Sequence, residues 1–227
     1  MGCLAHEPSA SFIKQLVEQD KYKEFVETGT YTGETALWAS KLFSRVFTVE
    51  ISKEFQEKAK RNCAGQDNIV FLLGRSEEQL PTILRELHGP AIFWLDAHAG
   101  GGSYADKDDC PLLLELGLLS ARNLVDDLII IDDARGFLAP PPPPFDAEVW
   151  PSIHAVLDAV DPRRERYIVI IADMIICAPP RLRDKIEAFC AMVRPALSDS
   201  GQIPSHLRAL FTALRVVRGL WRRVALG

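Results

Sequence analysis

Two acidic residues, Glu27 and Glu50, stand at the ends of short apolar runs, and a glycine-spaced turn follows the first of them. The turn has the pattern E-x-G-x-x-x-G, with Gly29 and Gly33 as its glycines. Gly29 allows the backbone to turn sharply and to approach a ligand, and Gly33 allows a helix to begin close to the strand. Glu50 is placed to accept hydrogen bonds from the two hydroxyls of a ribose. These residues predict a nucleoside-binding βαβ unit.

The same turn argues against one class of ligand. A dinucleotide-binding turn needs the pattern G-x-G-x-x-G, and a phosphate-binding loop of the P-loop type needs a lysine. Residues 27–35 contain neither feature. The pattern therefore favours a ligand that contains ribose and adenine but no pyrophosphate.

Residues 27–33, with the sequence ETGTYTG, resemble motif I of S-adenosylmethionine-dependent methyltransferases with a Rossmann-like fold. The variant is most similar to the metal-dependent O-methyltransferases of the catechol, caffeoyl-CoA and macrocin types, and the similarity in motif order extends over residues 20–180. Arg75 stands where many methyltransferases have an acid near the adenine amino group, which leaves Ser76 for that contact. The resemblance implies that S-adenosylmethionine binds at Glu27, Gly29, Thr30, Tyr31, Gly33, Glu50, Ser76 and Asp96.

A second set of acids, Asp96, Asp132 and Asp133, follows the fourth and fifth apolar runs. Three carboxylates at neighbouring strand ends repel one another unless a cation joins them, and oxygen ligands suit Mg²⁺. A metal at this place would hold an acceptor hydroxyl and lower its pKa. The resemblance implies the same ligand positions, because the metal-dependent O-methyltransferases have an Asp after strand four and an acidic pair after strand five.

The residue that accepts the proton of the hydroxyl is less clearly marked. The catechol-type enzymes have a lysine three residues after the first metal ligand, and Ala99 occupies that position here. His98 and Lys107 are substitutes, and Asp96 itself is a third candidate. We therefore expect Asp96 and His98 to be the catalytic residues.

Two other functions remain open. The segment Asp96-Ala97-His98 also resembles the D-A-H metal motif of arginases and ureohydrolases, although the second Asp of that motif is replaced by Gly100. A metal-dependent hydrolase would leave the glycine turn without a role. The other alternative is a cofactor-binding protein without catalysis. At the level of single residues, Asp133 could merely cap a helix and His98 could merely bond to the backbone.

Apolar runs and helical patterns alternate along the chain, which predicts an α/β fold with a Rossmann-like, doubly wound and mostly parallel sheet. The resemblance implies an antiparallel last strand. The polar residues named above follow strand ends, where ligands bind in such sheets. The predicted strands are 23–27, 45–50, 69–73, 91–96, 128–132, 166–172 and 174–178, and the predicted helices are 10–20, 34–43, 52–63, 77–87, 111–122 and 152–160.

Composition bounds the partners. A net charge of −5 argues against nucleic acid as the main partner. The five cysteines form no C-x-x-C pair, so reduced thiols in the cytoplasm are expected. No apolar run approaches the ~20 residues of a membrane-spanning helix. The expected acceptor is a small molecule or a glycan, and residues 97–109 and 134–150 are expected to select it.

The C-terminal segment differs in charge from the rest of the chain. Residues 201–227 contain five arginines and no acid, and their pattern predicts a basic amphipathic helix that follows a methyltransferase domain at residues 1–200. Such a helix could lie on an anionic membrane, which would make the protein membrane-associated. Alternatively, its apolar face packs on the domain or forms a homodimer.

Overall fold

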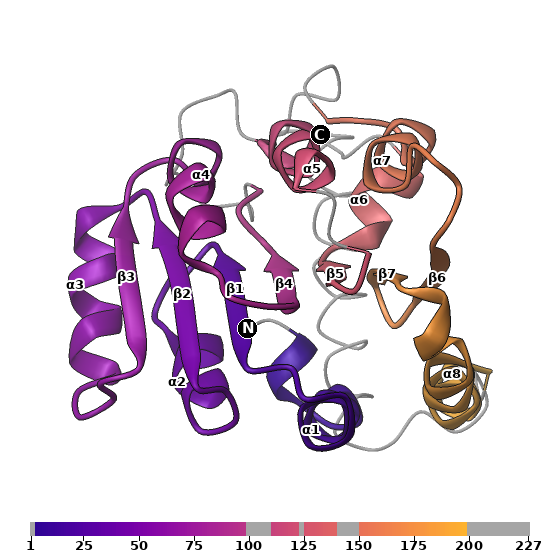
Figure 1. Ribbon diagram of the computed structural model, residues 1–227, viewed down its shortest axis with the longest axis horizontal. Coiled ribbons are helices and arrows are strands. Elements are labelled where there is room, and N and C mark those ends of the chain that lie inside the picture. Colours follow the sequence, from indigo (N-terminus) through magenta and orange to yellow (C-terminus); the bar gives the residue numbers. More distant parts are fainter. Residues whose placement is uncertain (1–2, 99–109, 123–124, 140–149, 199–227) are drawn as a thin grey trace, which may run out of the picture.

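The computed structural model describes residues 3–98, 110–122, 125–139 and 150–198. Seven strands form one sheet in the order β3-β2-β1-β4-β5-β7-β6 (Figure 1). The first five strands in this order are parallel, β7 is antiparallel to β5, and β6 is antiparallel to β7. The predicted fold is confirmed. The strands are β1 (Glu24–Thr28), β2 (Arg45–Glu50), β3 (Ile69–Leu73), β4 (Ala91–Leu95), β5 (Leu128–Ile131), β6 (Tyr167–Ile171) and β7 (Met174–Ala178).

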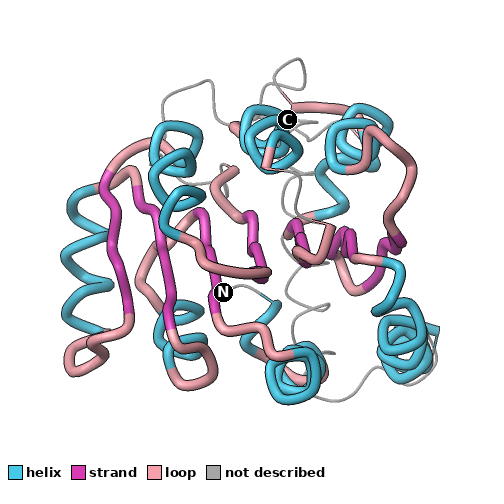
Figure 2. The backbone as a smooth tube through the Cα atoms, viewed as in Figure 1, coloured by secondary structure: helices cyan, strands magenta, loops and turns pink. Residues whose placement is uncertain are grey.

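Helices cover both faces of this sheet (Figure 2). They are α1 (Ser9–Asp20), α2 (Glu34–Ser40), α3 (Lys53–Asn62), α4 (Ser76–Glu86), α5 (Leu112–Ala121), α6 (Ala134–Leu138), α7 (Ile153–Val160) and α8 (Arg183–Ser198), with short 3-10 turns at Cys3–Ala5 and Pro180–Leu182. No helix in the described ranges is both long and apolar enough to cross a membrane. The predicted tail helix at 201–227 lies outside the described residues.

The central strands are apolar because both of their faces are buried. In β4, Ile92 and Trp94 pack in one cluster with residues of α1, α2 and α8, while Phe93 and Leu95 pack in a second cluster with α4, α5 and α7. Figure 1 shows α5 and α7 on one side of this half of the sheet, and α1 and α8 on the other. Each such side chain contributes about 1.5–3 kcal/mol when buried.

The register places the carboxyl ends of the parallel strands at one level. Thr28 lies opposite both Val49 and Leu95, and Leu95 lies opposite Ile131. The ladder continues one residue further, where the Asp132 amide donates to the carbonyl of Leu95 at 3.1 Å. The residues after β1, β2, β4 and β5 therefore meet at one edge of the sheet, which we call the carboxyl edge.

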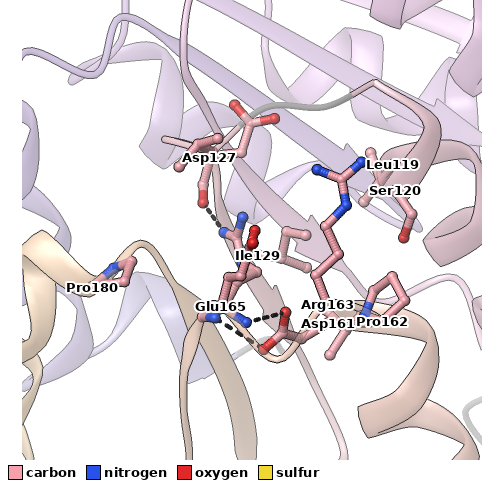
Figure 3. A pocket seen from close by; sticks show the side chains of 12 residues that line it. Leu119, Ser120, Asp127, Ile129, Asp161, Pro162, Arg163, Glu165 and Pro180 are labelled. Atoms are coloured by element: carbon pink, nitrogen blue, oxygen red, sulfur yellow. Dashed lines mark hydrogen bonds between the residues drawn. The ribbon is translucent and has the colours of Figure 1, made fainter.

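A cavity of ≈ 90 Å³ lies at the opposite edge, among Asp127, Asp161, Arg166 and neighbouring residues (Figure 3). The Asp161 carboxylate accepts the backbone amides of Glu165 and Arg166 at 3.0 and 2.9 Å. The Arg166 guanidinium donates to the carbonyls of Asp127 and Cys177. These bonds join the segments before β5 and β6. We therefore regard Asp161 and Arg166 as residues that stabilise the fold.

Candidate cofactor and metal site

The turn after β1 is built around two glycines with positive φ. Gly29 has φ +90°, and a Cβ atom there would lie 2.2 Å from the carbonyl oxygen of Asp96. Gly33 has φ +81°, and a Cβ atom there would lie 2.9 Å from the Cβ atom of Ala59 in α3. Only glycine avoids both problems, so the first position brings the turn against the end of β4 and the second brings α2 against α3.

Glu50 is held at the end of β2 by backbone amides. Its Oε2 accepts from the amide of Tyr31 at 2.7 Å, and its Oε1 accepts from the amide of Ser52 at 2.8 Å. Burial raises the pKa of Glu50, and these amides oppose that rise. Because a carboxylate oxygen accepts more than one hydrogen bond, both oxygens retain capacity for ligand hydroxyls. Tyr31 has φ 49° and an exposed side chain whose ring lies 4.6 Å from that of Phe55.

Glu27 lies beneath this turn and is 1% exposed. Its Oε2 accepts from the Thr48 hydroxyl at 2.6 Å, and the Thr48 hydroxyl lies 2.5 Å from that of Thr30. Burial, together with the charges of Asp96 and Glu50, raises the pKa of Glu27 to about 8, although the Thr48 hydrogen bond opposes that rise. A cation near Glu27 would therefore stabilise its ionised form.

Asp96, His98 and Asp133 come together at the ends of β4 and β5. Each offers one ligand atom, and these atoms lie within 4.8 Å of one another. Burial and, after it, the charge of Asp132 raise the pKa of Asp96 to about 7. Burial lowers the pKa of His98, but the surrounding carboxylates, led by Asp133, raise it overall. The same imidazole, more than any other group, lowers the pKa of Asp133.

Asp132 stands beside this group but outside it. It is buried, and its Oδ1 accepts from the backbone amide of Asp133 at 2.8 Å. The structure thus gathers two members of the predicted metal triad, Asp96 and Asp133, together with His98. Asp133 occupies the position before the first residue of α6 with φ 52°, yet its side chain makes no capping hydrogen bond.

A hairpin turn holds Asp133 in this place. Ala172 and Asp173, both with positive φ, connect β6 to β7. Asp173 accepts the backbone amides of Ala134 and Arg135 at 2.8 and 3.0 Å, through its carbonyl and its Oδ1. The Arg135 guanidinium pairs with Asp173 and, at 2.6 Å, with Oδ1 of Asp133. The turn therefore fixes the start of α6 and the direction of the Asp133 carboxylate.

Ser76, the predicted adenine contact, is the first residue of α4 and is buried near a charge that the sequence did not mark. Glu115 of α5 is 1% exposed and lies beside Ser76 and Thr28, and its burial raises its pKa. Its Oε1 has no hydrogen-bond partner in the described part of the chain, and neither has the Thr28 hydroxyl. The sequence signal for this site is Glu115 itself, which is the one acid in the leucine-rich helix α5.

Comparison with known proteins assigns the fold. No family model matches the sequence, and no curated protein matches it significantly. The O-methyltransferase TomG from Streptomyces achromogenes, solved with SAM, superimposes with a TM-score of 0.53 and 15% identity, over 77% of this chain and 80% of its own. This protein has a methyltransferase fold. An O-methyltransferase from Bacillus cereus in complex with SAH superimposes with a TM-score of 0.53 and 16% identity, over 76% of this chain and 82% of its own. Cofactor-bound Rv0187 from MTB superimposes with a TM-score of 0.56 and 18% identity, over 77% of this chain and 80% of its own.

Proposed function

We propose that this protein transfers a methyl group from S-adenosylmethionine to a hydroxyl group. The observation that carries the proposal is the Gly29 turn, which packs against the Asp96 backbone and presents Glu50 at the carboxyl edge. Solved structures with the same fold, such as TomG, contain SAM. A nucleoside-binding turn in this fold favours that cofactor over a dinucleotide.

In the proposed complex, Glu50 accepts hydrogen bonds from the ribose, and Gly29, Thr30, Tyr31 and Gly33 form the turn around it. Glu27 lies below this turn, and Asp96 lies beside it. The polar groups that shift the pKa of Glu27 are threonine hydroxyls and other carboxylates, and none of them is a cation. This negative environment suits the ammonium and sulfonium of S-adenosylmethionine. Ser76 lies at the start of α4, where the resemblance places the adenine.

The reaction needs a group that receives a proton. The acceptor oxygen would bond to the methyl carbon, the carbon–sulfur bond would break, and S-adenosylhomocysteine would leave with the electron pair on sulfur. Without a bound metal ion, burial raises the pKa of Asp96 to about 7, which suits a group that takes the hydroxyl proton at neutral pH. His98 is the second candidate, because it lies in the same group.

The metal-dependent O-methyltransferases imply a divalent ion at this place, and the residues present fit one. Asp96, His98 and Asp133 supply two carboxylates and an imidazole within 4.8 Å. When bound, the ion would hold the acceptor hydroxyl and lower its pKa. We propose that these side chains hold it.

The acceptor is proposed to be a small molecule or a sugar. Phe137 and Trp150 place their rings 5.5 and 5.4 Å from that of His98. Phe137 is buried and Trp150 is partly exposed, so Trp150 is available to pack against a sugar ring or a phenol. The hydrolase alternative uses the same Asp96 and His98 but gives the Glu50 turn no role, which favours methyl transfer.

Cofactor binding tests the proposal directly. Glu50→Ala removes the ribose acceptor and is expected to weaken binding of S-adenosylmethionine about 10- to 100-fold, equivalent to about 1–3 kcal/mol. Glu57→Ala, at an exposed position paired with Lys60, is the matched control and should bind like the unchanged protein. The measurement is isothermal titration calorimetry with the cofactor and its demethylated product.

Unchanged affinity of Glu50→Ala for both ligands would refute the ribose assignment. Transfer of labelled methyl groups to a panel of glycans and catechols then separates an enzyme from a cofactor-binding protein without catalysis.

A further inference from the structure

The His98 imidazole is an unusual element of the carboxyl edge. Its side chain is 1% exposed, and its Nε2 has no hydrogen-bond partner among the residues that the structure describes. Oδ2 of Asp133 lies 3.5 Å from this nitrogen, which is within ion-pair range but long for a hydrogen bond. A buried polar atom left without a partner costs about 1–3 kcal/mol, so a native structure seldom keeps one without a reason.

We propose that Asp96, His98 and Asp133 form a metal site that prefers Mn²⁺ to Mg²⁺, with Asp132 outside the set of ligands. The proposal deepens the proposed function but concerns metal binding alone, so it is tested without cofactor or acceptor.

The geometry of the three side chains fits one ion. Oxygen and nitrogen ligands lie roughly 2.0–2.2 Å from such an ion, so two of them stand at most about 4.4 Å apart. The three ligand atoms here lie within 4.8 Å of one another. A small movement of side chains is enough to close that difference. The packing of His98 against Phe137 and Trp150 limits how far its ring turns away.

One oxygen of Asp133 and one oxygen of Asp132 already have partners in the chain. Oδ1 of Asp133 pairs with Arg135, and the Asp133 atom that faces His98 is Oδ2. Oδ1 of Asp132 accepts the amide of Asp133, which supports the positive φ of that residue. Asp132 thus orients a ligand, as outer-shell carboxylates commonly do at metal sites.

The ligand types decide the preference among metals. Mg²⁺ demands near-ideal octahedral geometry and oxygen ligands, whereas imidazole suits transition metals. Carboxylates suit both Mg²⁺ and Mn²⁺, and Mn²⁺ is the member of the first-row series with the lowest affinity for such ligands. Two carboxylates with one imidazole therefore favour Mn²⁺ over Mg²⁺, while the oxygen-only set Asp96, Asp132 and Asp133 would favour Mg²⁺.

The test uses the full chain after treatment with a chelator and removal of the chelator. Mn²⁺ is titrated while the electron paramagnetic resonance signal of the free ion is recorded, and Mg²⁺ is titrated by calorimetry. We expect one Mn²⁺ per chain, bound at least tenfold more tightly than Mg²⁺. Equal affinities, or no binding of Mn²⁺, would overturn the proposal.

Two variants separate the competing sets of ligands. His98→Gln is expected to weaken Mn²⁺ binding at least tenfold. Asp132→Asn is expected to change it less than threefold, because the amide oxygen of Asn still accepts from the Asp133 backbone. Asp158→Asn, at an exposed position, is the neutral control. The reverse pattern, with loss in Asp132→Asn and none in His98→Gln, would contradict the site.

A measurement on the unchanged protein covers the case in which His98→Gln does not fold. A bound imidazole produces modulation from ¹⁴N in the spin-echo signal of Mn²⁺, and we expect that modulation here. Its absence in the Mn²⁺-loaded protein would exclude His98 as a ligand. Binding of Mn²⁺ together with failure to bind S-adenosylmethionine would leave this site standing and remove the proposed function.

Discussion

The two edges of the sheet treat buried charge differently. At the amino edge, which lies opposite the carboxyl edge, Glu24 accepts the amides of His88 and Gly89. Burial raises the pKa of Asp127 there to about 7, and the amide of Ala91 and the guanidinium groups of Arg122 and Arg166 oppose that rise. At the carboxyl edge, Glu27 has threonine hydroxyls as partners, and the nearby carboxylates of Asp96 and Glu50 raise its pKa. In the described part of the chain, Nε2 of His98 and Oε1 of Glu115 have no hydrogen-bond partner.

This contrast separates structure from binding. The acids at the amino edge have amide and guanidinium partners from the chain itself, so they contribute to the fold. Charges at the carboxyl edge are left partly unbalanced, and a cationic cofactor or a metal ion would complete them. Perturbed groups of this kind cluster at functional sites.

The largest expected effect breaks the contact between the turn and β4. Gly29→Ala places a Cβ atom 2.2 Å from a backbone oxygen at φ +90°, so we expect a loss of about 3–5 kcal/mol in the free energy of unfolding and no cofactor binding. Urea denaturation and calorimetry measure the two quantities.

Gly65→Ala is the matched control for that change. Gly65 has φ +86°, but nothing lies within 4 Å of its virtual Cβ atom. It therefore reports the cost of the backbone conformation alone, about 1–2 kcal/mol. Similar losses in both variants would show that the contact with Asp96 is unimportant.

A smaller effect is expected in the dependence of stability on pH. The pKa of Glu27 rises from 4.5 to about 8 on folding, so the folded protein holds a proton that the unfolded chain releases. The stability from this proton is fully present below pH 4.5 and is lost as pH rises to about 8. Glu27→Gln should flatten this fall and be more stable than the unchanged protein by up to about 4 kcal/mol at pH 8.

Thermal or urea unfolding between pH 5 and 9 measures this difference. Glu57→Gln, an exposed change of the same type, should follow the unchanged protein. Saturating S-adenosylmethionine should reduce the fall more than S-adenosylhomocysteine does, because only the former carries a sulfonium. Parallel curves for the unchanged protein and Glu27→Gln would show that Glu27 is not the group responsible.

The smallest effect on the domain is expected from the C-terminal segment. Residues 201–227 carry five arginines and no acid, so the full chain should sediment with anionic liposomes at low salt, whereas a chain ending at residue 201 should stay in solution. Cofactor affinity should be the same for both. If both chains stay in solution, gel filtration decides between a docked helix and a homodimer.

The sequence predicted the sheet well because its central strands are apolar on both faces. Each of β1 to β5 lies within one residue of the predicted range at its ends, and the acids that follow them meet at one edge. Those strand ends depend on local pattern and on the general geometry of parallel sheets, both of which are readable from sequence.

Other features depend on distant contacts. The sequence predicts a loop after β5, whereas the structure has α6 there, because the start of α6 depends on the Asp173 turn, which lies far along the chain. The sequence predicts Asp132 as the third member of the metal group, but the structure has His98 with Asp96 and Asp133. Asp133 lies in a turn with positive φ, which a local sequence pattern does not predict. α8 was not predicted, although Ile186, Phe189 and Val193 have helical spacing and are buried.

The hairpin turn at Ala172 and Asp173 has a consequence for protein engineering. Tight surface turns between strands are common places for an inserted tag or for new chain ends. This turn supplies acceptors to the first two amides of α6 and a partner to Arg135, so a cut or an insertion there would release Asp133. The turn at Gly65, where nothing crowds the chain, is the better place to open the molecule.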